Sequence, residues 1–343
     1  MTGFPDIVRT EFSKAIKRKP TDLSVTLRKP LDIQSNCLYD IWVNEEHFIA
    51  KLYLKADELD SAPRREFQAL TLLSPLNIAP QPIFYEPSIA PVVIYRYMEG
   101  EMWGRRRVSL TDLSKLMAVW LQVHSVPVDW PARGYERSLQ EVEDGFRQHF
   151  RDYLDWAALE FEPGQQAAEM ILKLLEERTF VTQELADYSP VSRFCRSDPR
   201  FANVIQRPDG TLGMVDWEDS GLLDPARQLA DFLTHPNQED LIDWPAWQIF
   251  VNPYLTTLGE QDSTIERRLH LYLEIFPFFW LVIITKMAIK MASTGQLTDW
   301  NVNGLPVNDR LRRYLARAIS WPELDYRNVL DNLEPIRFFP DRC

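Results

Sequence analysis

The sequence predicts an α+β protein with two lobes, and two observations support this fold class. Residues 23–54 alternate apolar and polar side chains with the period of two that is typical of half-buried strands. From Leu110 onward the apolar side chains recur instead every three or four residues, as they do on one face of a helix. We therefore expect a β-rich N-terminal lobe at residues 1–97 and a larger, mostly helical C-terminal lobe at residues 98–343.

The N-terminal lobe is expected to hold strands and one main helix. The strands are expected at residues 23–30, 37–44, 47–55 and 90–101, and the helix at residues 62–76. Pro63 suits the first turn of that helix, because proline lacks the N–H group that a helix start leaves unpaired. Residues 80–88, "PQPIFYEPS", are expected to turn the chain.

The C-terminal lobe is expected to be helical apart from one hairpin. Helices are expected at residues 110–126, 139–161 and 164–180, and again from Pro225 to about Trp321. The hairpin is expected within residues 203–216, because "RPDG" is a strong turn signal between two short apolar runs. The most apolar stretch, residues 275–284, is too short to span a bilayer, which needs about 20 apolar residues, so we expect a buried core helix.

The composition excludes several classes of function. A formal charge of −12 argues against nucleic-acid binding through a broad basic surface. The three cysteines contain no CxxC pair, so they offer neither a disulfide framework nor the spacing of a zinc site. The N-terminal segment lacks the apolar core of a signal peptide, and we expect a cytoplasmic protein without a membrane partner.

Residues 195–221 carry an unusual density of side-chain oxygens. Asn203 and Asp216 fall at the open end of the predicted hairpin, where neighbouring strands lie about 5 Å apart. An amide and a carboxylate without clustered Cys or His suit a hard cation such as Mg²⁺, which also takes phosphate oxygens. Asp198 lies five residues before Asn203 and could reach the same place as a base. Each of these residues also has a simpler interpretation, as a turn former or a strand-end carboxylate.

Lys51 stands in the middle of the apolar run "FIAKLYL", where an unpaired ammonium group would be costly to bury. Glu66, on the next predicted helix, is a plausible counter-ion, although Lys51 could also be an ordinary surface lysine. Phosphoryl transfer needs a residue that orients the attacking hydroxyl, ligands for Mg²⁺ and positive charge at the nucleotide phosphates. Glu218 and Asp219 could face either the substrate or solvent, and His124 is expected to be a packing histidine.

The segment "RSDPRFANVI", followed by "GMVDWEDSGLLDPARQLADF", resembles the catalytic region of the aminoglycoside phosphotransferase and choline kinase family. The resemblance implies a protein-kinase-like fold. It also implies that Asp198 matches the catalytic aspartate, and that Asn203 and Asp216 match the Mg²⁺ ligands. Asp224 and Asp231 match two later aspartates of the family, and Asp231 is then expected to hold the backbone of the catalytic loop.

The resemblance extends over most of the chain. "QSNCLYDIWV" resembles the phosphate loop of the family, with Ser35 and Asn36 in place of the glycines of protein kinases. "IYRYMEGE" resembles the hinge, which implies that an adenine bonds backbone groups of Arg96 and Met98.

Lys51 and Glu66 match the Lys–Glu pair of the family, but one position departs from its pattern. The histidine of the family's "HGD" is Arg196 here, in "RSD". Arg196 could replace that histidine by pairing with Asp216, or it could misplace Asp198.

Together, the motifs predict an ATP- and Mg²⁺-dependent kinase that phosphorylates a hydroxyl group of a small molecule. A protein substrate is less expected, because no long activation segment follows "VDW". Two alternatives stay open: a nucleotide-binding pseudokinase, which Arg196 favours, and a hydrolase with paired carboxylates such as Asp216 and Glu218. An aminoglycoside, choline or homoserine would all suit as acceptor, and the oligomeric state is open as well.

Overall fold

The computed structural model describes residues 4–28, 36–54, 61–87, 91–104, 106–133, 137–242, 244–297, 301–320 and 326–340. Contacts within the chain divide it into two units. Unit 1 comprises residues 1–133 and 193–223, and unit 2 comprises residues 134–192 and 224–343. This division differs from the lobe boundary expected between residues 97 and 98, which stays a prediction.

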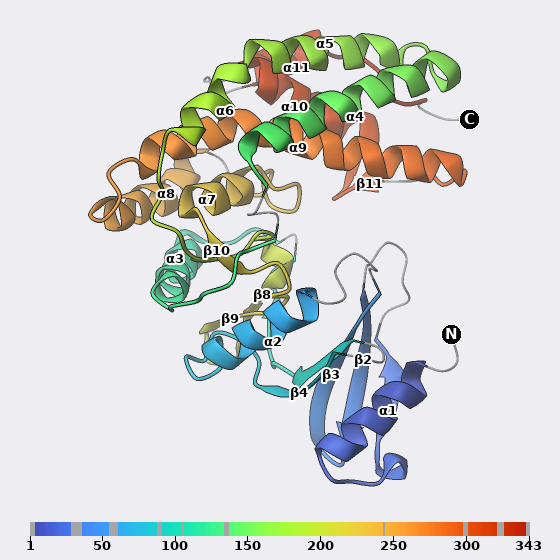
Figure 1. Cartoon of the computed structure of the whole chain (residues 1–343), viewed down its shortest axis with the longest axis vertical. Coiled ribbons are helices and arrows are strands. Elements are labelled where there is room, and N and C mark those ends of the chain that lie inside the picture. Colours follow the sequence, from blue (N-terminus) through green and yellow to red (C-terminus); the bar gives the residue numbers. More distant parts are fainter. Residues whose placement is uncertain are drawn as a thin grey trace. The chain divides into compact units, whose positions relative to one another are not determined.

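Unit 1 contains a five-stranded antiparallel sheet with the strand order β1-β2-β3-β5-β4 (Figure 1). Its strands are β1 (Ser24–Leu27), β2 (Asn36–Val43), β3 (Glu46–Tyr53), β4 (Pro82–Glu86) and β5 (Val92–Arg96). The four strands expected from the alternating pattern are confirmed. The expectation of a turn at residues 80–88 was wrong, because β4 forms there. Its proline, Pro82, is tolerated because it is the first residue of an edge strand whose register is irregular between Pro82 and Phe84.

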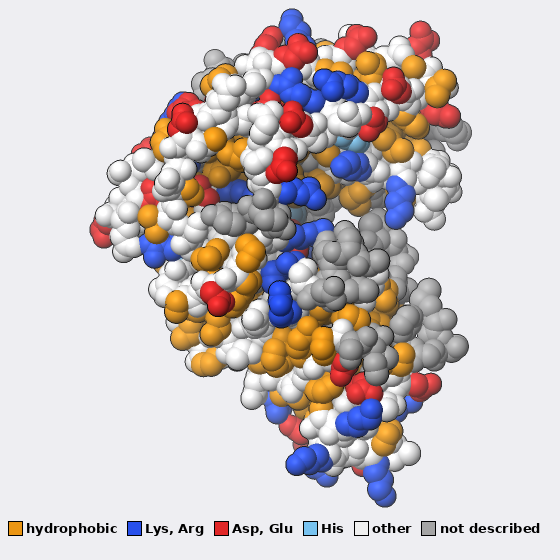
Figure 2. Space-filling view, viewed as in Figure 1, with side chains coloured by type: hydrophobic (Ala, Val, Ile, Leu, Met, Phe, Trp, Pro, Cys, Tyr) orange, Lys and Arg blue, Asp and Glu red, His pale blue; other side chains and the backbone are white. Residues whose placement is uncertain are grey.

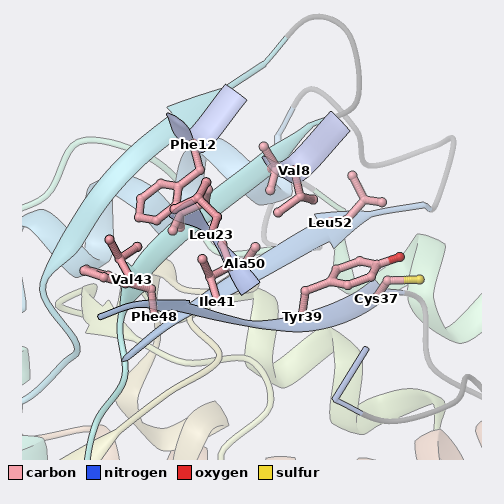
Figure 3. Packing of buried hydrophobic residues seen from close by; sticks show 12 residues of the cluster. Val8, Phe12, Leu23, Cys37, Tyr39, Ile41, Val43, Phe48, Ala50 and Leu52 are labelled. Atoms are coloured by element: carbon pink, nitrogen blue, oxygen red, sulfur yellow. The ribbon is translucent and has the colours of Figure 1, made fainter. Parts of the chain in front are cut away.

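An N-terminal helix that the sequence analysis did not predict covers one face of this sheet. In α1 (Phe4–Ala15), Val8 and Phe12 lie four residues apart and are fully buried. They pack against Ile41 of β2 and Ala50 of β3, as Figure 3 shows. Since side chains alternate along a strand, Lys51 projects from the opposite face of β3.

The predicted helix after β3 lies in the same unit. α2 (Ala62–Leu73) begins at the expected residue and has a proline in its first turn. Its buried side includes Glu66 and Leu70, and Phe67 stacks on Tyr85 of β4 with 5.5 Å between the ring centroids. Glu66 is therefore fixed by a helix that packs against the sheet.

The rest of unit 1 frames a short loop at residues 196–203. The predicted hairpin is confirmed: β8 (Val204–Gln206) pairs with β9 (Leu212–Met214), and β6 (Glu101–Met102) pairs with β8 on its other side. Gly210 in the connecting turn has φ 78°, a conformation that glycine adopts without strain. Before the loop, β7 (Arg193–Cys195) pairs with β10 (Gly221–Leu223), and α3 (Leu110–His124) packs beside β7.

His124 is the packing histidine that the sequence predicted. It is 4% exposed, and its Nδ1–H donates to the carbonyl oxygen of Phe194 at 2.8 Å. Burial lowers the pKa of His124 from 6.5 to about 4.

This lowered pKa predicts an acid-dependent loss of stability. His124 takes up a proton near pH 6.5 in the unfolded chain and only near pH 4 in the folded chain. The neutral, buried His124 therefore contributes fully to the stability of the folded state above pH 6.5, and this contribution is lost as the pH falls toward 4. The loss should reach about 3 kcal/mol in the free energy of unfolding. His124→Asn should flatten this pH dependence in urea unfolding, whereas His270→Asn, at an exposed position, should not. Equal slopes for wild type and His124→Asn would contradict the assignment.

Unit 2 is mostly helical, as predicted. Its helices are α4 (Leu139–Glu160), α5 (Gly164–Glu177), α6 (Thr179–Ala186), α7 (Pro225–Thr234), α8 (Trp244–Gly259), α9 (Ile265–Ser293), α10 (Val307–Ser320) and α11 (Arg327–Asn332), and β11 (Asn301–Val302) pairs with β12 (Leu305–Pro306). The single helix expected at residues 164–180 is in fact two, which separate at Arg178. Acidic and basic side chains are interspersed over this unit on the face drawn in Figure 2.

α9 contains the most apolar stretch of the sequence. The stretch was judged too short to span a bilayer, but α9 is 29 residues long and has the length and composition of a possible span. Half of its most apolar window is buried, and it packs against α4, α6, α7, α8 and α10. This packing is that of a core helix within unit 2.

Candidate active site

Asp216 lies just after β9, in an uncommon backbone conformation. Its φ is 68°, which asparagine and aspartate tolerate better than most residues. The residues around it hold the chain in place: the N–H of Val215 donates to the carbonyl of Asn203 at 3.0 Å, and the indole of the buried Trp217 donates to the carbonyl of Met214 at 3.0 Å. Strain at an anchored position of this kind is common at functional sites.

The carboxylate of Asp216 is the point at which several predicted site residues meet. Lys51 donates to its Oδ1, and the amide of Asn203 lies 3.3 Å from its Oδ2. Arg200, to which the sequence analysis gave no role, also contacts Oδ2 at 3.3 Å. Burial alone would raise the pKa of Asp216, but the charges of Lys51 and Arg200 outweigh it and hold the pKa well below its usual range.

Lys51 is 3% exposed and contacts three carboxylates. Besides Asp216, its Nζ lies 3.2 Å from Glu66 and 3.1 Å from Glu218, so the expected Lys51–Glu66 ion pair is present. Burial would lower the pKa of Lys51, but these acids raise it well above its usual value. Burial raises the pKa of Glu66 to about 7 against the opposing effect of Lys51.

The segment after Asp216 contains Glu218 and Asp219, which from the sequence could face either the substrate or solvent. Glu218 faces the cluster, where the amide of Asn36 donates to its Oε2 at 2.6 Å. Asn36 is the first residue of β2, and its predicted phosphate-loop neighbour Ser35 lies outside the described residues. Asp219 turns elsewhere and lies 3.5 Å from Arg133.

The loop at residues 196–203 carries Asp198, whose side chain is 30% exposed. Its Oδ2 lies 3.0 Å from Nε of Arg200, and the N–H of Arg200 donates to the carbonyl of Asp198 at 3.1 Å. Asn203 closes the loop and is buried. The loop and the end of β9 thus bring Asp198 and Asp216 to one guanidinium group, with the amide of Asn203 beside Asp216. A basic residue two positions after Asp198, inside the recognised motif, is the signal that could have identified Arg200.

Arg196 contacts Asp216, the partner considered for it from the sequence, through the backbone. It is 3% exposed, and its Nη2 donates to the backbone carbonyl of Asp216 at 2.7 Å, not to the carboxylate. Its guanidinium also stacks on Trp217, 4.7 Å from the ring centroid. Arg196 therefore supports the backbone at Asp216.

Of the two predicted hinge residues, Arg96 is the last residue of β5 and Met98 lies two residues after it. The N–H of Arg96 donates to Gln81 at 2.8 Å, and its side chain pairs with Glu46 at 3.0 Å. The N–H of Met98 makes no hydrogen bond to any of the described residues. Met98 packs closely on Gly213 of β9, where a Cβ atom would come within 2.2 Å of its sulfur. The role of both residues in binding adenine stays a prediction.

Of the two later aspartates, Asp224 directly precedes α7 in unit 2 and Asp231 lies within it. Asp224 caps the helix by accepting from the N–H of Ala226 at 2.9 Å, and it pairs with the buried Arg268 at 2.7 Å. Asp231 is 6% exposed. Its implied hold on the catalytic loop stays a prediction.

The donor set of the cluster fits a hard divalent cation. Carboxylate oxygens of Glu66, Asp216 and Glu218 lie within 4.8 Å of one another. Oε1 of Glu66 is buried and has no hydrogen-bond partner among the described residues. Oxygen donors of this kind, with the Asn203 amide beside them, are the ligands that Mg²⁺ prefers.

Among the solved structures with a similar fold are two choline kinases and a spectinomycin phosphotransferase. The choline kinase from Cryptosporidium parvum Iowa II is 15% identical, with a TM-score of 0.60 over 95% of this chain and 97% of that chain. Choline kinase LicA from Streptococcus pneumoniae is 17% identical, with a TM-score of 0.59 over 92% and 99%. Spectinomycin phosphotransferase, solved with ADP and spectinomycin, is 14% identical, with a TM-score of 0.54 over 93% and 90%. These similarities confirm the predicted protein-kinase-like fold, with a small antiparallel sheet and a helical lobe.

The sequence itself also matches a known family. No curated protein matches it significantly. The model of the phosphotransferase enzyme family (APH), however, matches residues 28–267, which is well over half of the chain. The matched range includes Lys51, Glu66 and the whole catalytic loop. The chain therefore belongs to the phosphotransferase enzyme family.

Proposed function

We propose that this protein is an ATP-dependent kinase that transfers the γ-phosphoryl group to a hydroxyl group of a small molecule. The observation that carries this proposal is the convergence on Asp216. A buried lysine, an amide and a partly exposed arginine meet its carboxylate, with Asp198 beside them. A base, oxygen ligands and positive charge in one place are the parts that phosphoryl transfer requires.

Each residue then has a role in the reaction. Lys51 holds the nucleotide phosphates, aimed by its ion pair with Glu66. Bound at Asn203 and Asp216, Mg²⁺ would neutralise charge on the phosphate oxygens. Asp198 orients the acceptor hydroxyl and takes its proton while the new oxygen–phosphorus bond forms and the bond to the leaving ADP breaks. The chemistry is positioning and charge stabilisation, without a covalent enzyme intermediate.

The acceptor is proposed as a class of compound. The structural neighbours are named for choline, ethanolamine and spectinomycin. The net charge of −12 also favours a cationic ligand slightly. We therefore place amine-bearing alcohols first among the compounds to test, with ADP release as the measurement.

Asp216→Asn is the variant that tests nucleotide binding. Asparagine suits the positive φ at this position but removes the carboxylate charge. Calorimetry should show that wild type binds ATP more tightly with Mg²⁺ than with EDTA. The variant should lose about tenfold or more of the affinity measured with Mg²⁺, since a charged contact is worth about 1.5–3 kcal/mol. Asp209→Asn, at the exposed hairpin turn, should bind like wild type.

The outcomes separate the candidate functions. Nucleotide binding without ADP release for any alcohol would favour the pseudokinase alternative. Equal ATP affinity in wild type and Asp216→Asn, with Mg²⁺ present, would contradict the metal assignment. If wild type binds no nucleotide in any condition, the kinase proposal is overturned.

A further inference from the structure

Lys51, Arg196 and Arg200 each contact Asp198 or Asp216, and they differ in their access to solvent. The side chain of Lys51 is 4% exposed and already has three carboxylate partners. Arg196 is 3% exposed and is used to hold a backbone carbonyl. The side chain of Arg200, in contrast, is 39% exposed. Arg200 is therefore the cation of this group that an incoming ligand can reach directly.

The guanidinium of Arg200 bridges the predicted base and the predicted metal ligand. Its Nε lies 3.0 Å from Asp198 and its Nη2 lies 3.3 Å from Asp216. The backbone of Arg200 is fixed, since its N–H donates to Asp198 and its carbonyl accepts from Asn203 at 3.0 Å. Only the side chain can change partners without disturbing the loop.

We infer that Arg200 is a phosphate-binding residue, which holds Asp198 and Asp216 until nucleotide enters and then turns its guanidinium to the terminal phosphoryl group. This inference rests on the proposed function. The exchange leaves Asp198 available to accept the hydroxyl proton, and it removes a competing cation from the carboxylate of Asp216.

The energetics favour this exchange of partners. Both carboxylates are partly exposed, at 30% and 26% of their side chains, and Asp216 keeps its contact with Lys51 when the guanidinium of Arg200 leaves. A guanidinium has a planar set of donors that matches phosphate oxygens and can bind two of them at once. An arginine placed on the transferred group is also a strong source of charge stabilisation in phosphoryl transfer.

Binding measurements test the inference without an acceptor. With Mg²⁺ present, Arg200→Ala should weaken binding of the β,γ-imido analogue of ATP about tenfold or more, because it loses a charged contact. Binding of ADP, which lacks the terminal phosphoryl group, should change less than about twofold. Arg200→Lys should retain part of the affinity for the analogue, because the lysine ammonium keeps the positive charge but lacks the planar set of N–H donors that binds two phosphate oxygens at once.

A second measurement should change in the opposite direction. Mn²⁺ alone, without nucleotide, should bind Arg200→Ala several-fold more tightly than wild type, because the competing guanidinium is gone. If Arg200 had only a structural role, Arg200→Ala would weaken the binding of both the ATP analogue and Mn²⁺. Arg267→Ala removes an exposed arginine that pairs with Glu184 at 2.6 Å in unit 2, and it should leave every affinity unchanged.

The outcomes distinguish the inference from the proposed function. If wild type binds ADP and the analogue, but Arg200→Ala loses both equally or neither, the inference is overturned and the kinase proposal stands. If wild type binds neither nucleotide, both are overturned. Thermal unfolding identifies a misfolded Arg200→Ala protein, and Arg200→Gln and Arg200→Lys then give the same comparison with smaller changes of side-chain volume.

Discussion

Asp198→Asn should reduce phosphoryl transfer by about a thousandfold while ATP binding stays within a few-fold of wild type. A positioned general base contributes about 10²–10⁴ in rate, and asparagine cannot take the hydroxyl proton. Nucleotide affinity should persist because Lys51, Asn203 and Asp216 all remain in place. ADP release with an acceptor found by screening wild type, together with calorimetry of ATP, measures both quantities.

Two comparisons make the Asp198 experiment decisive. Asp209→Asn changes an aspartate of the hairpin turn that has no contact with Lys51, Asp198 or Asp216, and it should keep full turnover. Unchanged turnover in Asp198→Asn would remove Asp198 from the catalytic role. A loss of ATP affinity as large as the loss of turnover would instead indicate that Asp198 takes part in nucleotide binding. Arg200, which contacts Asp198, would then be the next residue to test.

Local patterns predicted the elements that carry the site. The period of two over residues 23–54 placed Lys51 within a strand, and the helical spacing after it placed Glu66 on a helix. The turn "RPDG" predicted the hairpin whose open end brings Asn203 and Asp216 together. These signals are contained in short segments, so the sequence alone was sufficient for them.

Tertiary contacts decided what the sequence did not predict. α1 has only a few apolar side chains, and its helical form is supported by burial of Val8 and Phe12 against the sheet. β4 contains a proline and is a strand because it pairs with β5 at the sheet edge.

Side-chain direction was the other missing information. From the sequence, Glu218 could have faced either solvent or the site. Its contact with Lys51 depends on the turn at Asp216, and no sequence pattern predicts the positive φ of that residue. Arg200 was given no role from the sequence, and the fold shows that it lies between two carboxylates.

Lys51→Met should destabilise the protein by about 3–5 kcal/mol, the usual cost of removing one partner from a buried ionic contact. The substitution leaves Glu66, Asp216 and Glu218 close together without the ammonium that neutralises them. Urea unfolding measures the change, and Lys173→Met, at an exposed position of α5, should change the free energy of unfolding by less than about 0.5 kcal/mol.

A double substitution identifies the cause of this destabilisation. If repulsion among the carboxylates is responsible, adding Glu218→Gln to Lys51→Met should restore part of the lost free energy, with a coupling of about 0.5–3 kcal/mol. Purely additive effects would mean that Glu218 is not the source of the repulsion, and that the loss arises at the other two partners of Lys51, Glu66 and Asp216. The double variant should still bind ATP poorly, because the ammonium that holds the phosphates is absent in both. Recovery of stability without recovery of ATP binding would therefore separate the two roles of Lys51, as the counter-ion of a buried acidic cluster and as a ligand for phosphate.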